Sequence, residues 1–150
     1  MKSLKHIDAR GEARMVDVSM KPVMLRTAAA RGHIRLRKQT LDLIGSQGVA
    51  KGNVLASARL AGILAAKKTG ELVPLCHSLA LTHCEVDFQV PKARDRIVIL
   101  ASAKTAAQTG VEMEALTAVS VAALAIYDMC KGVDSTMRIG GIKLLHKSKV

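Results

Sequence analysis

The sequence predicts an α+β fold in which two long helices cover one face of an antiparallel sheet. Two apolar runs, 54–68 and 109–131, have the length and composition of helices, and the second repeats its apolar residues at intervals of three and four. The shorter segments between them alternate apolar and polar residues, which is typical of half-buried strands. The resulting order after Gly32 is strand, helix, strand, strand, helix, strand. This is the βαββαβ order of a ferredoxin-like plait.

The first half of the chain is expected to contain one strand and two helices after an N-terminal extension over 1–30. Apolar and basic residues alternate over 32–37, which predicts the first strand. A short extra helix is expected over 40–44. Asn53 is a good N-cap, so the first long helix is expected over 54–68.

The second half is expected to contain three strands around the second long helix. Apolar residues over 79–90 indicate a strand, although its alternation is interrupted near His83. A turn over 91–95 connects this strand to the next, which is expected over 96–103. The last strand is expected over 139–145.

The second long helix has a clear signal at each end. Thr109, with Glu112 three residues later, forms the pattern of a capping box. Apolar residues recur along one side of the helix over 116–130, and Gly132 is expected to end it.

The composition predicts a single domain, 1–150, whose core is built from aliphatic side chains. The chain has 150 residues, which is the size of one domain with one core. Phe88 and Tyr127 are its only aromatic residues, so Ala, Val, Leu, Ile and Met must fill the interior. Small side chains bury little area each, and a domain of this kind often completes its burial by forming an oligomer.

The charge of the chain suggests an anionic partner. Basic residues outnumber acidic ones 23 to 12, which gives a net charge of +11. The chain lacks the aromatic platforms of single-strand binders and the usual spacing of zinc fingers, so we expect a phosphate-bearing small molecule and no nucleic acid. A basic RNA-binding module on the same fold remains the alternative, with Lys143, Lys147 and Lys149 as its contacts.

The sequence predicts a cytoplasmic protein that does not interact with membranes. Residues 1–11 are polar and lack the apolar core of a signal peptide. We find no apolar run of the roughly 18 residues that a membrane span needs. The three cysteines are odd in number and unpatterned, which fits free thiols in a reducing cytosol.

Two pairs of neighbouring cysteine and histidine residues resemble metal ligands. The pairs are Cys76-His77 and His83-Cys84, and their spacing matches no common zinc module. The strand expected between them would also hold them apart. We therefore expect no metal and no cofactor, and a metal-binding protein remains a third alternative.

Five polar residues are candidates for a functional site. Lys51 lies just before a helix N-terminus, which favours anions. His77 lies in an irregular segment after a proline, where it can donate a hydrogen bond to a phosphate or carry a proton. Glu114 lies in the first turn of the second long helix, while Asp128 and Lys131 lie one turn apart near its end. The alternative is that all five are ordinary surface residues.

The length of this helix limits how its two ends can act together. Glu114 and Asp128 are fourteen residues apart, which corresponds to about 21 Å of helical rise. They cannot serve one reacting centre within one chain. If both act, either there are two sites, or one site takes opposite helix ends from two subunits.

Several segments together resemble the MoaC family, the cyclic pyranopterin monophosphate synthases of molybdenum cofactor biosynthesis. The longest spans 109–131, reads TGVEMEALTAVSVAALAIYDMCK and is highly specific. The resemblance extends over nearly the whole chain. The other matching segments are GEARMVDVS at 11–19, KGNV at 51–54, Ala58-Arg59 with Ala61-Gly62, and PLCH at 74–77.

The resemblance implies a ferredoxin-like fold that assembles as a homohexamer, a trimer of dimers, with active sites between subunits. The implied activity is that of a lyase acting on a triphosphate-bearing small molecule. It would convert (8S)-3′,8-cyclo-7,8-dihydroguanosine 5′-triphosphate to cyclic pyranopterin monophosphate with release of diphosphate. No cofactor is implied.

The resemblance also implies roles for individual residues. Lys51 and Lys131 would form an acid–base pair near the rearranging purine, and Asp128 would be catalytic by orienting or tuning Lys131. A lysine among other cations has a lowered pKa and can act as a base. The residues expected to bind substrate are Leu75, Cys76, His77, Glu112, Met113 and Glu114, with Lys21, Arg26 and Lys67 as further candidates for contacts with the triphosphate.

The chain departs from the family pattern at three places. Ser78 stands where a proline is expected, which bears on the loop after His77. Asn53 replaces the aspartate of some relatives, although either residue caps a helix well. The segment after Lys147 is shorter than the Gly/Ser/Lys-rich tail that is usual in the family.

Overall fold

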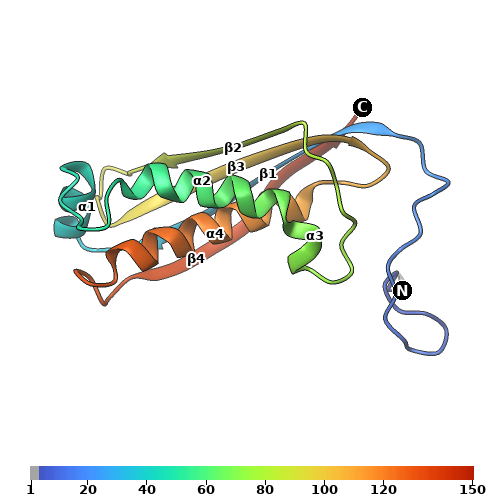
Figure 1. The fold of residues 1–150 in the computed structure, drawn as a ribbon, viewed down its shortest axis with the longest axis horizontal. Helices are drawn as coiled ribbons and strands as arrows, with labels where there is room; N and C mark the ends of the chain where they lie inside the picture. The colour runs from blue at the N-terminus through green and yellow to red at the C-terminus, as the bar shows by residue number, and fades with distance from the viewer. Residues whose placement is uncertain (1–3) are drawn as a thin grey trace.

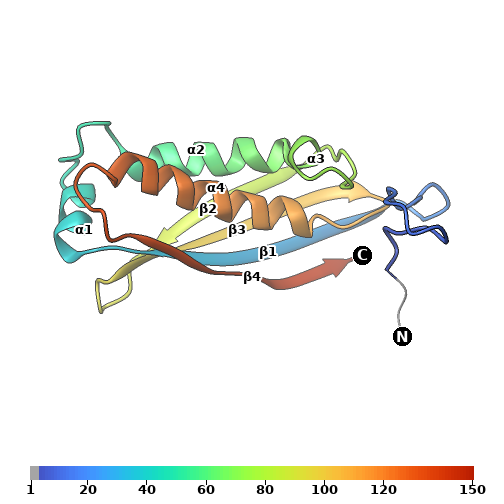
Figure 2. The same ribbon diagram turned by 90° about the horizontal axis from the view of Figure 1, so that it is seen from below.

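A sheet with helices on one side forms the body of the molecule in the computed structural model, which describes residues 4–150 (Figures 1 and 2). These residues form an antiparallel sheet with the strand order β2-β3-β1-β4. The expected N-terminal extension is described from residue 4 onward, and the first three residues lie outside the described part. The elements are β1 (Met24–Arg35), α1 (Lys38–Gly45), α2 (Val54–Lys67), α3 (Thr69–Leu72), β2 (His83–Gln89), β3 (Arg96–Ala107), α4 (Glu112–Cys130) and β4 (Arg138–Lys149).

The predicted α+β fold and the ferredoxin-like order of its elements are confirmed. The long helices α2 and α4 lie side by side over one face of the sheet (Figure 2). The central strands β1 and β3 pair with each other, while β4 pairs with β1 and β2 pairs with β3. All three pairings are antiparallel, as the plait requires.

The two long helices begin close to their predicted positions. The Oδ1 of Asn53 accepts a hydrogen bond from the backbone nitrogen of Ala56 at 3.0 Å, which confirms the N-cap of α2. The short helix α1 covers the expected residues 40–44 and one or two more at each end. The turn of helix α3 was not expected, and its buried Thr69 donates a hydrogen bond to the last turn of α2.

The prediction of the first strand was wrong at its beginning, because β1 starts at Met24 rather than at residue 32. The missed residues include Ala28 and Ala30, which are fully buried beneath the helices. Alanine has little preference for strands, and the three consecutive alanines at 28–30 show no alternation that would indicate one. The pairing with β3 over the full length of β1 stabilises this half of the strand.

The other strands also differ from their predicted bounds. β3 continues to Ala107 and β4 continues to Lys149, well beyond residues 103 and 145. β2 begins at His83, where the alternation of apolar residues breaks, so the prediction of a strand from residue 79 was wrong. The preceding segment still lies beside β3, because the Thr105 hydroxyl donates a hydrogen bond to the Ala80 carbonyl at 2.6 Å.

The predicted capping box of α4 is absent from the described residues. The N-cap residue is Val111, and no side chain caps the helix there. The Glu112 carboxylate instead accepts a hydrogen bond from Lys147 Nζ at 2.8 Å. It also folds back over Gly110, where a Cβ would overlap it. The extension of β4 to Lys149 places Lys147 within reach, and this competing cation explains the difference.

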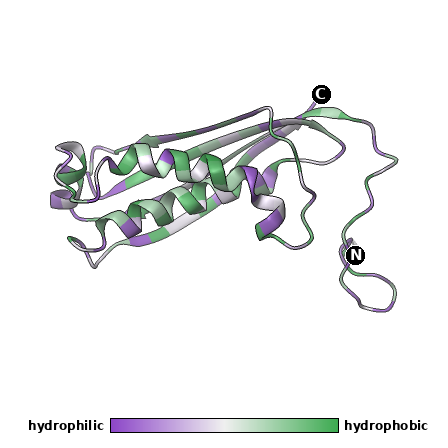
Figure 3. Ribbon diagram, viewed as in Figure 1, coloured by the Kyte–Doolittle hydropathy of each residue, from purple (hydrophilic) through white to green (hydrophobic). Residues whose placement is uncertain are grey.

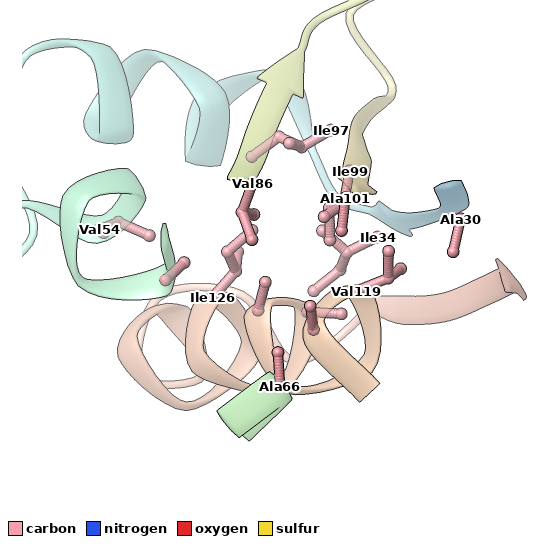
Figure 4. Packing of buried hydrophobic residues seen from close by; sticks show 14 of the residues in the cluster. Ala30, Ile34, Val54, Ala66, Val86, Ile97, Ile99, Ala101, Val119 and Ile126 are labelled. Atoms are coloured by element: carbon pink, nitrogen blue, oxygen red, sulfur yellow. The ribbon is translucent and has the colours of Figure 1, made fainter. Parts of the chain in front are cut away.

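The core is aliphatic, as the composition predicts, and lies between the helices and the sheet (Figure 4). Ile34, Ile97 and Ile99 project from the central strands toward Val119 and Ile126 of α4. Hydrophobic and neutral residues dominate both long helices (Figure 3). The core side chains are small, so the layers can approach closely.

Gly62 lies at a tight contact between the two long helices. A Cβ at this position would lie 2.8 Å from the carbonyl oxygen of Ala118 in α4 and 3.1 Å from Val86 in β2. A contact with backbone cannot be relieved by a change of rotamer, so glycine is required where α2 crosses α4 and the sheet.

Within residues 4–150, α4 is the one helix long and apolar enough to cross a membrane by length and composition. The expectation from the sequence concerned an apolar run of roughly 18 residues, and charged residues at both ends of α4, Glu112, Glu114 and Asp128, interrupt its apolar stretch. However, 44% of its most apolar window is buried inside the fold, and the core helix of a globular domain meets the same test. Its apolar character is accounted for by its packing between α2 and the sheet.

We expect Gly62→Ala to lower the free energy of unfolding by up to about 2 kcal/mol. A gain of about 1 kcal/mol in helix propensity is outweighed by an overpacking cost of about 1–3 kcal/mol. Urea denaturation at a fixed protein concentration measures the difference. Gly45→Ala is the matched control, because a Cβ there has no atom within 4 Å. A variant at residue 62 as stable as this control would contradict the close contact.

Candidate active site

The predicted site residues fall into two groups at opposite ends of α4. Asp128 and Lys131 lie at the C-terminal end of the helix, and Lys51 reaches them from the segment before α2. The predicted substrate-binding residues lie around the N-terminal end. No single group within one chain therefore contains all of the predicted residues.

At the C-terminal end, Asp128 binds two lysines at once. Its Oδ2 lies 3.0 Å from Lys51 Nζ, and its Oδ1 lies 2.9 Å from Lys131 Nζ. Lys51 Nζ also donates a hydrogen bond to the main-chain carbonyl of Asp128 at 3.0 Å. Each of the three side chains is at least half exposed, so a ligand can reach the cluster. The structure thus brings the three predicted catalytic residues together.

The two lysines determine the charge state of this cluster. Hydrogen bonds from Lys131 and Lys51 lower the pKa of Asp128 to about 2. The same contact with Asp128 raises the pKa of Lys131. The expectation that Lys131 has a lowered pKa was therefore wrong for the protein without ligand, because an aspartate rather than another cation is its nearest charged neighbour. In this state Lys131 holds its proton and supplies a positive charge, and it becomes a better proton donor only when its contact with Asp128 is broken.

A buried aspartate fixes the turn that follows Lys131. The Asp134 carboxylate accepts hydrogen bonds from the Arg37 nitrogen at 3.0 Å, from the Thr40 hydroxyl at 2.8 Å and from the Thr136 hydroxyl at 2.6 Å. Burial opposes its ionisation, but these donors hold the pKa of Asp134 well below its usual range. This network connects the end of α4 to the start of α1 and β4, and so positions Lys131.

At the N-terminal end of α4, most of the predicted substrate-binding residues line a cavity of about 360 Å³. It lies between the loop after α3, the start of α4 and the N-terminal segment. Its predicted members are Lys21, Leu75, Cys76, His77, Glu112, Met113 and Glu114, and its other lining residues are Lys5, His6, Val16, Val18, Leu79, Thr109 and Gly110.

His77 is held in place by the N-terminal segment. Its Nε2 lies 2.7 Å from the Val16 carbonyl, which can only accept a hydrogen bond, so Nε2 carries a proton. The second ring nitrogen, Nδ1, can then exchange a proton with a ligand. This contact also explains why the segment around Val16 belongs to the site.

The two glutamates at the start of α4 differ in charge state. Glu114 is only 3% exposed, and burial raises its pKa. Burial also opposes the ionisation of Glu112, yet the hydrogen bond from Lys147 holds the pKa of Glu112 below its usual value. One carboxyl group is therefore suited to proton transfer, and the other is suited to an ionic contact.

Arg26 and Lys67 lie beside the main cavity rather than in it. Arg26 donates hydrogen bonds to the carbonyls of Ala107 and Gln108, and it borders a hollow of about 270 Å³ that also contains Glu112 and Lys147. Lys67 borders a smaller hollow next to Glu114. Both cations can therefore reach a long anionic ligand that extends out of the main cavity.

Three basic residues at this end were not among the predicted site residues. The long strand β4, in which Lys149 pairs with Arg26 of β1, brings Lys147 close to Glu112 and Arg26. The sequence does not indicate this pairing, so Lys147 was not predicted. Lys5 and His6 line the cavity from the N-terminal segment. Their positions in the sequence do not indicate a role in the site, because only long-range contacts place them beside the cavity.

The proposed pairs of metal ligands have different neighbours in the structure. His77 binds the Val16 carbonyl, whereas His83 lies 3.6 Å from the Glu85 carboxylate. Burial raises the pKa of Cys76 and of Cys84. Across residues 4–150, no three His, Cys, Asp or Glu side chains are grouped in a way that could hold a metal ion.

Comparison with known proteins adds an independent observation. The family model described as "MoaC family" matches residues 15–149. The chain is 57% identical over 148 residues to a protein of Pelotomaculum thermopropionicum named cyclic pyranopterin monophosphate synthase, covering 99% of this chain and 87% of that protein. It is 58% identical over 146 residues to cyclic pyranopterin monophosphate synthase 1 of Mycobacterium tuberculosis, covering 97% and 85%. It is also 58% identical over 144 residues to a protein of Chloroflexus aggregans named cyclic pyranopterin monophosphate synthase, covering 96% of this chain and 87% of that protein.

We expect Asp128→Asn to lower the pKa of Lys131, because the substitution removes the carboxylate that raises it. Nitrogen-detected NMR titration of the lysine Nζ signals measures this shift. Asp42→Asn is the control, since Asp42 pairs with Arg94 on a different part of the surface. An unchanged Lys131 titration in the first variant would show that the ion pair does not form in solution.

Proposed function

The chain belongs to the MoaC family, and we propose that it converts (8S)-3′,8-cyclo-7,8-dihydroguanosine 5′-triphosphate to cyclic pyranopterin monophosphate and diphosphate. This is a lyase reaction of molybdenum cofactor biosynthesis, carried out by one domain in the cytoplasm. The observation that carries the proposal is the high identity, over almost the whole chain, to several proteins named for this synthase activity. Two clusters of charged residues at the ends of α4 supply groups that the chemistry needs.

We infer that each active site combines the two ends of α4 from two different subunits. The helix has 19 residues, which corresponds to about 27 Å. If two copies of α4 pack antiparallel, the Glu114 end of one lies beside the Asp128 end of the other. The outward side of the helix supports this packing, because Thr117, Val121 and Leu124 lie there partly or fully exposed. Leu60 and Leu64 of α2 are also exposed on the helix layer.

The cations at the N-terminal end of α4 are suited to bind the triphosphate. Lys21 lines the cavity, while Arg26, Lys67 and Lys147 border the hollows beside it. Formation of a cyclic phosphate requires a hydroxyl oxygen to attack the phosphorus next to the sugar, and the bond to diphosphate then breaks. Positive side chains around the leaving diphosphate stabilise the charge that develops on it.

The groups at the two ends can also move the protons that the ring rearrangement requires. Opening and rebuilding a purine ring moves protons on and off nitrogen and carbon. Lys131 enters the reaction protonated, and a substrate that displaces Asp128 removes the contact that raises the pKa of Lys131, so that Lys131 can then donate to a ring nitrogen. Glu114, whose pKa is raised by burial, can accept or return a proton more readily than an exposed carboxylate. Leu75, Cys76, His77 and Met113 then surround the substrate.

We further propose that the protein assembles as a homohexamer, a trimer of dimers. The antiparallel α4 contact makes a two-fold dimer with two equivalent sites. The small side chains of the core support this, because a protomer of this composition leaves apolar surface exposed.

We expect Lys51→Ala and Lys131→Ala each to reduce turnover by about 10²–10⁴-fold, because each removes a positioned proton donor. Diphosphate release from the cyclised guanosine triphosphate measures the rate. Lys92→Ala is the control, since Lys92 is exposed in the turn before β3. Activity retained by both site variants would refute the acid–base assignment.

We expect a mixture of Glu114→Gln and Asp128→Asn subunits to regain about one quarter of the wild-type activity. Each variant alone lacks one end in every site, whereas random pairing gives a quarter of the sites both intact ends. Native mass spectrometry verifies that the subunits have mixed. If verified mixed oligomers stay inactive, the two ends do not share a site.

A further inference from the structure

The Ser78 hydroxyl lies close to the turn of helix α3. A Cβ at Gly70 would lie 3.0 Å from Ser78 Oγ and 3.1 Å from Ser78 Cα, so glycine is needed for the two segments to approach this closely. Ser78 directly follows His77 and stands where the family pattern has a proline. A proline has neither a hydroxyl nor a main-chain N–H, so this chain carries a polar group that the pattern lacks.

A hollow of about 80 Å³ lies next to this hydroxyl, where the end of α2, the turn of α3 and the start of α4 come together (Figure 1). Its polar lining consists of Lys67, Glu71, Ser78 and Glu114. The first three of these are exposed, so the hollow opens to solvent on their side, whereas the buried Glu114 closes its inner end. At about 30 Å³ per molecule, the hollow has room for about two or three waters.

Glu114 borders this hollow and the main cavity at the same time. It is 3% exposed, and among residues 4–150 its carboxylate accepts a hydrogen bond only from its own main-chain nitrogen. A buried carboxylate with so few donors is unfavourable unless other donors reach it. The hollow is the space from which such donors can come.

Water is the occupant that suits this lining. A phosphate group in the hollow would meet the carboxyl groups of Glu71 and Glu114, which repel it. A water molecule can donate to the Glu114 carboxylate and accept from the Ser78 hydroxyl or from Lys67, which gives it the two to four polar partners that a bound water needs. The lining therefore favours water between Ser78 and Glu114.

We propose that the Ser78 hydroxyl and water in this hollow form a path by which Glu114 exchanges protons with bulk solvent, and that Ser78 is a positioning residue for this exchange. The proposal rests on the proposed function, in which Glu114 accepts and returns a proton. A substrate in the main cavity covers that side of Glu114, while the hollow leaves a second route to solvent on the other side.

The proton transfer along this path conserves atoms and charge. The Glu114 carboxyl group gives its proton to the nearest water and is left ionised. Each water, and the Ser78 hydroxyl, accepts one proton and passes on another, so that these groups end unchanged. The last proton is released to solvent at the outer end, between Lys67 and Glu71, and the reverse sequence returns a proton to Glu114.

The hydroxyl also influences the charge state of Glu114. Burial raises the pKa of Glu114, and the nearby Glu112 carboxylate raises it further. Hydrogen bonds donated to the ionised carboxylate from water held by Ser78 oppose this rise. The other titratable groups on the main-cavity side are Lys5, His6, Lys21, Cys76, His77 and Glu112. Those on the hollow side are Lys67 and Glu71, and a substitution of Ser78 leaves all of them in place.

The test compares Ser78→Ala and Ser78→Pro, which remove the hydroxyl, with Ser78→Thr, which retains it. The first two are expected to raise the pKa of Glu114 by about 0.5–1, the effect of losing one hydrogen bond of ordinary strength. Ser78→Thr is expected to titrate like the wild type. Carbon-detected NMR of the glutamate carboxyl groups in the ligand-free protein measures these values, and Glu114→Gln identifies the signal.

Ser46→Ala is the matched control, because the Ser46 hydroxyl donates to the Leu43 carbonyl at the other end of the molecule. Circular dichroism verifies that each variant is folded. If Glu114 titrates at the same pH in the wild type, Ser78→Ala and Ser78→Pro, the proposal is overturned. A shift that Ser78→Thr shares with the other two variants also overturns it, since the hydroxyl is then not the cause.

Turnover provides a second readout that separates this role from substrate binding. In Ser78→Ala the acidic side of the kcat profile is expected to move to higher pH, because less Glu114 is ionised at a given pH. KM is expected to stay unchanged, because Ser78 acts through Glu114. A raised KM with an unshifted kcat profile would contradict the proposal. If the wild type releases no diphosphate, the proposed function fails, while the NMR titration still decides whether Ser78 is linked to Glu114.

Discussion

α4 packs against α2 and the sheet through its alanine and valine side, and this packing holds the helix as one continuous rod between two polar ends. A lysine–aspartate cluster lies at one end, and a cavity with histidine, glutamate and lysine side chains lies at the other. A rod cannot fold back on itself, so the geometry of one chain leaves two incomplete groups. If one reaction centre uses both groups, as proposed above, the length of the helix requires the second group to come from another subunit.

The charges at the two ends are arranged for different tasks. At one end an aspartate between two lysines keeps Lys131 protonated. At the other, a buried Glu114 with a raised pKa lies close to Glu112, which is ionised beside Lys147. Several of the basic residues thus lie together around the main cavity and the hollow beside it, where the proposed triphosphate would bind.

Local signals made the helices and the order of elements predictable from the sequence. Asn53 fixes the start of α2 by a contact three residues away, and such short-range chemistry is visible in a sequence. Strand ends depend on distant pairing, so the first part of β1 and the last part of β4 were missed. For the same reason the contact between Lys147 and Glu112 was not predicted, and the prediction of a capping box was wrong. The positions of Lys51 and Asp128 beside each other also depend on tertiary contacts, and only the family resemblance anticipated them.

The buried Asp134 has a consequence for the order in which the chain folds. Its donors Arg37 and Thr40 lie more than ninety residues earlier in the sequence, whereas Thr136 is adjacent. Until those distant segments meet, the carboxylate must stay hydrated, because burial without donors would be strongly unfavourable. The closing of this large loop is entropically costly, and such non-local contacts slow folding. The junction next to Lys131 is therefore expected to become native late, after the helices and the β2–β3 hairpin have formed.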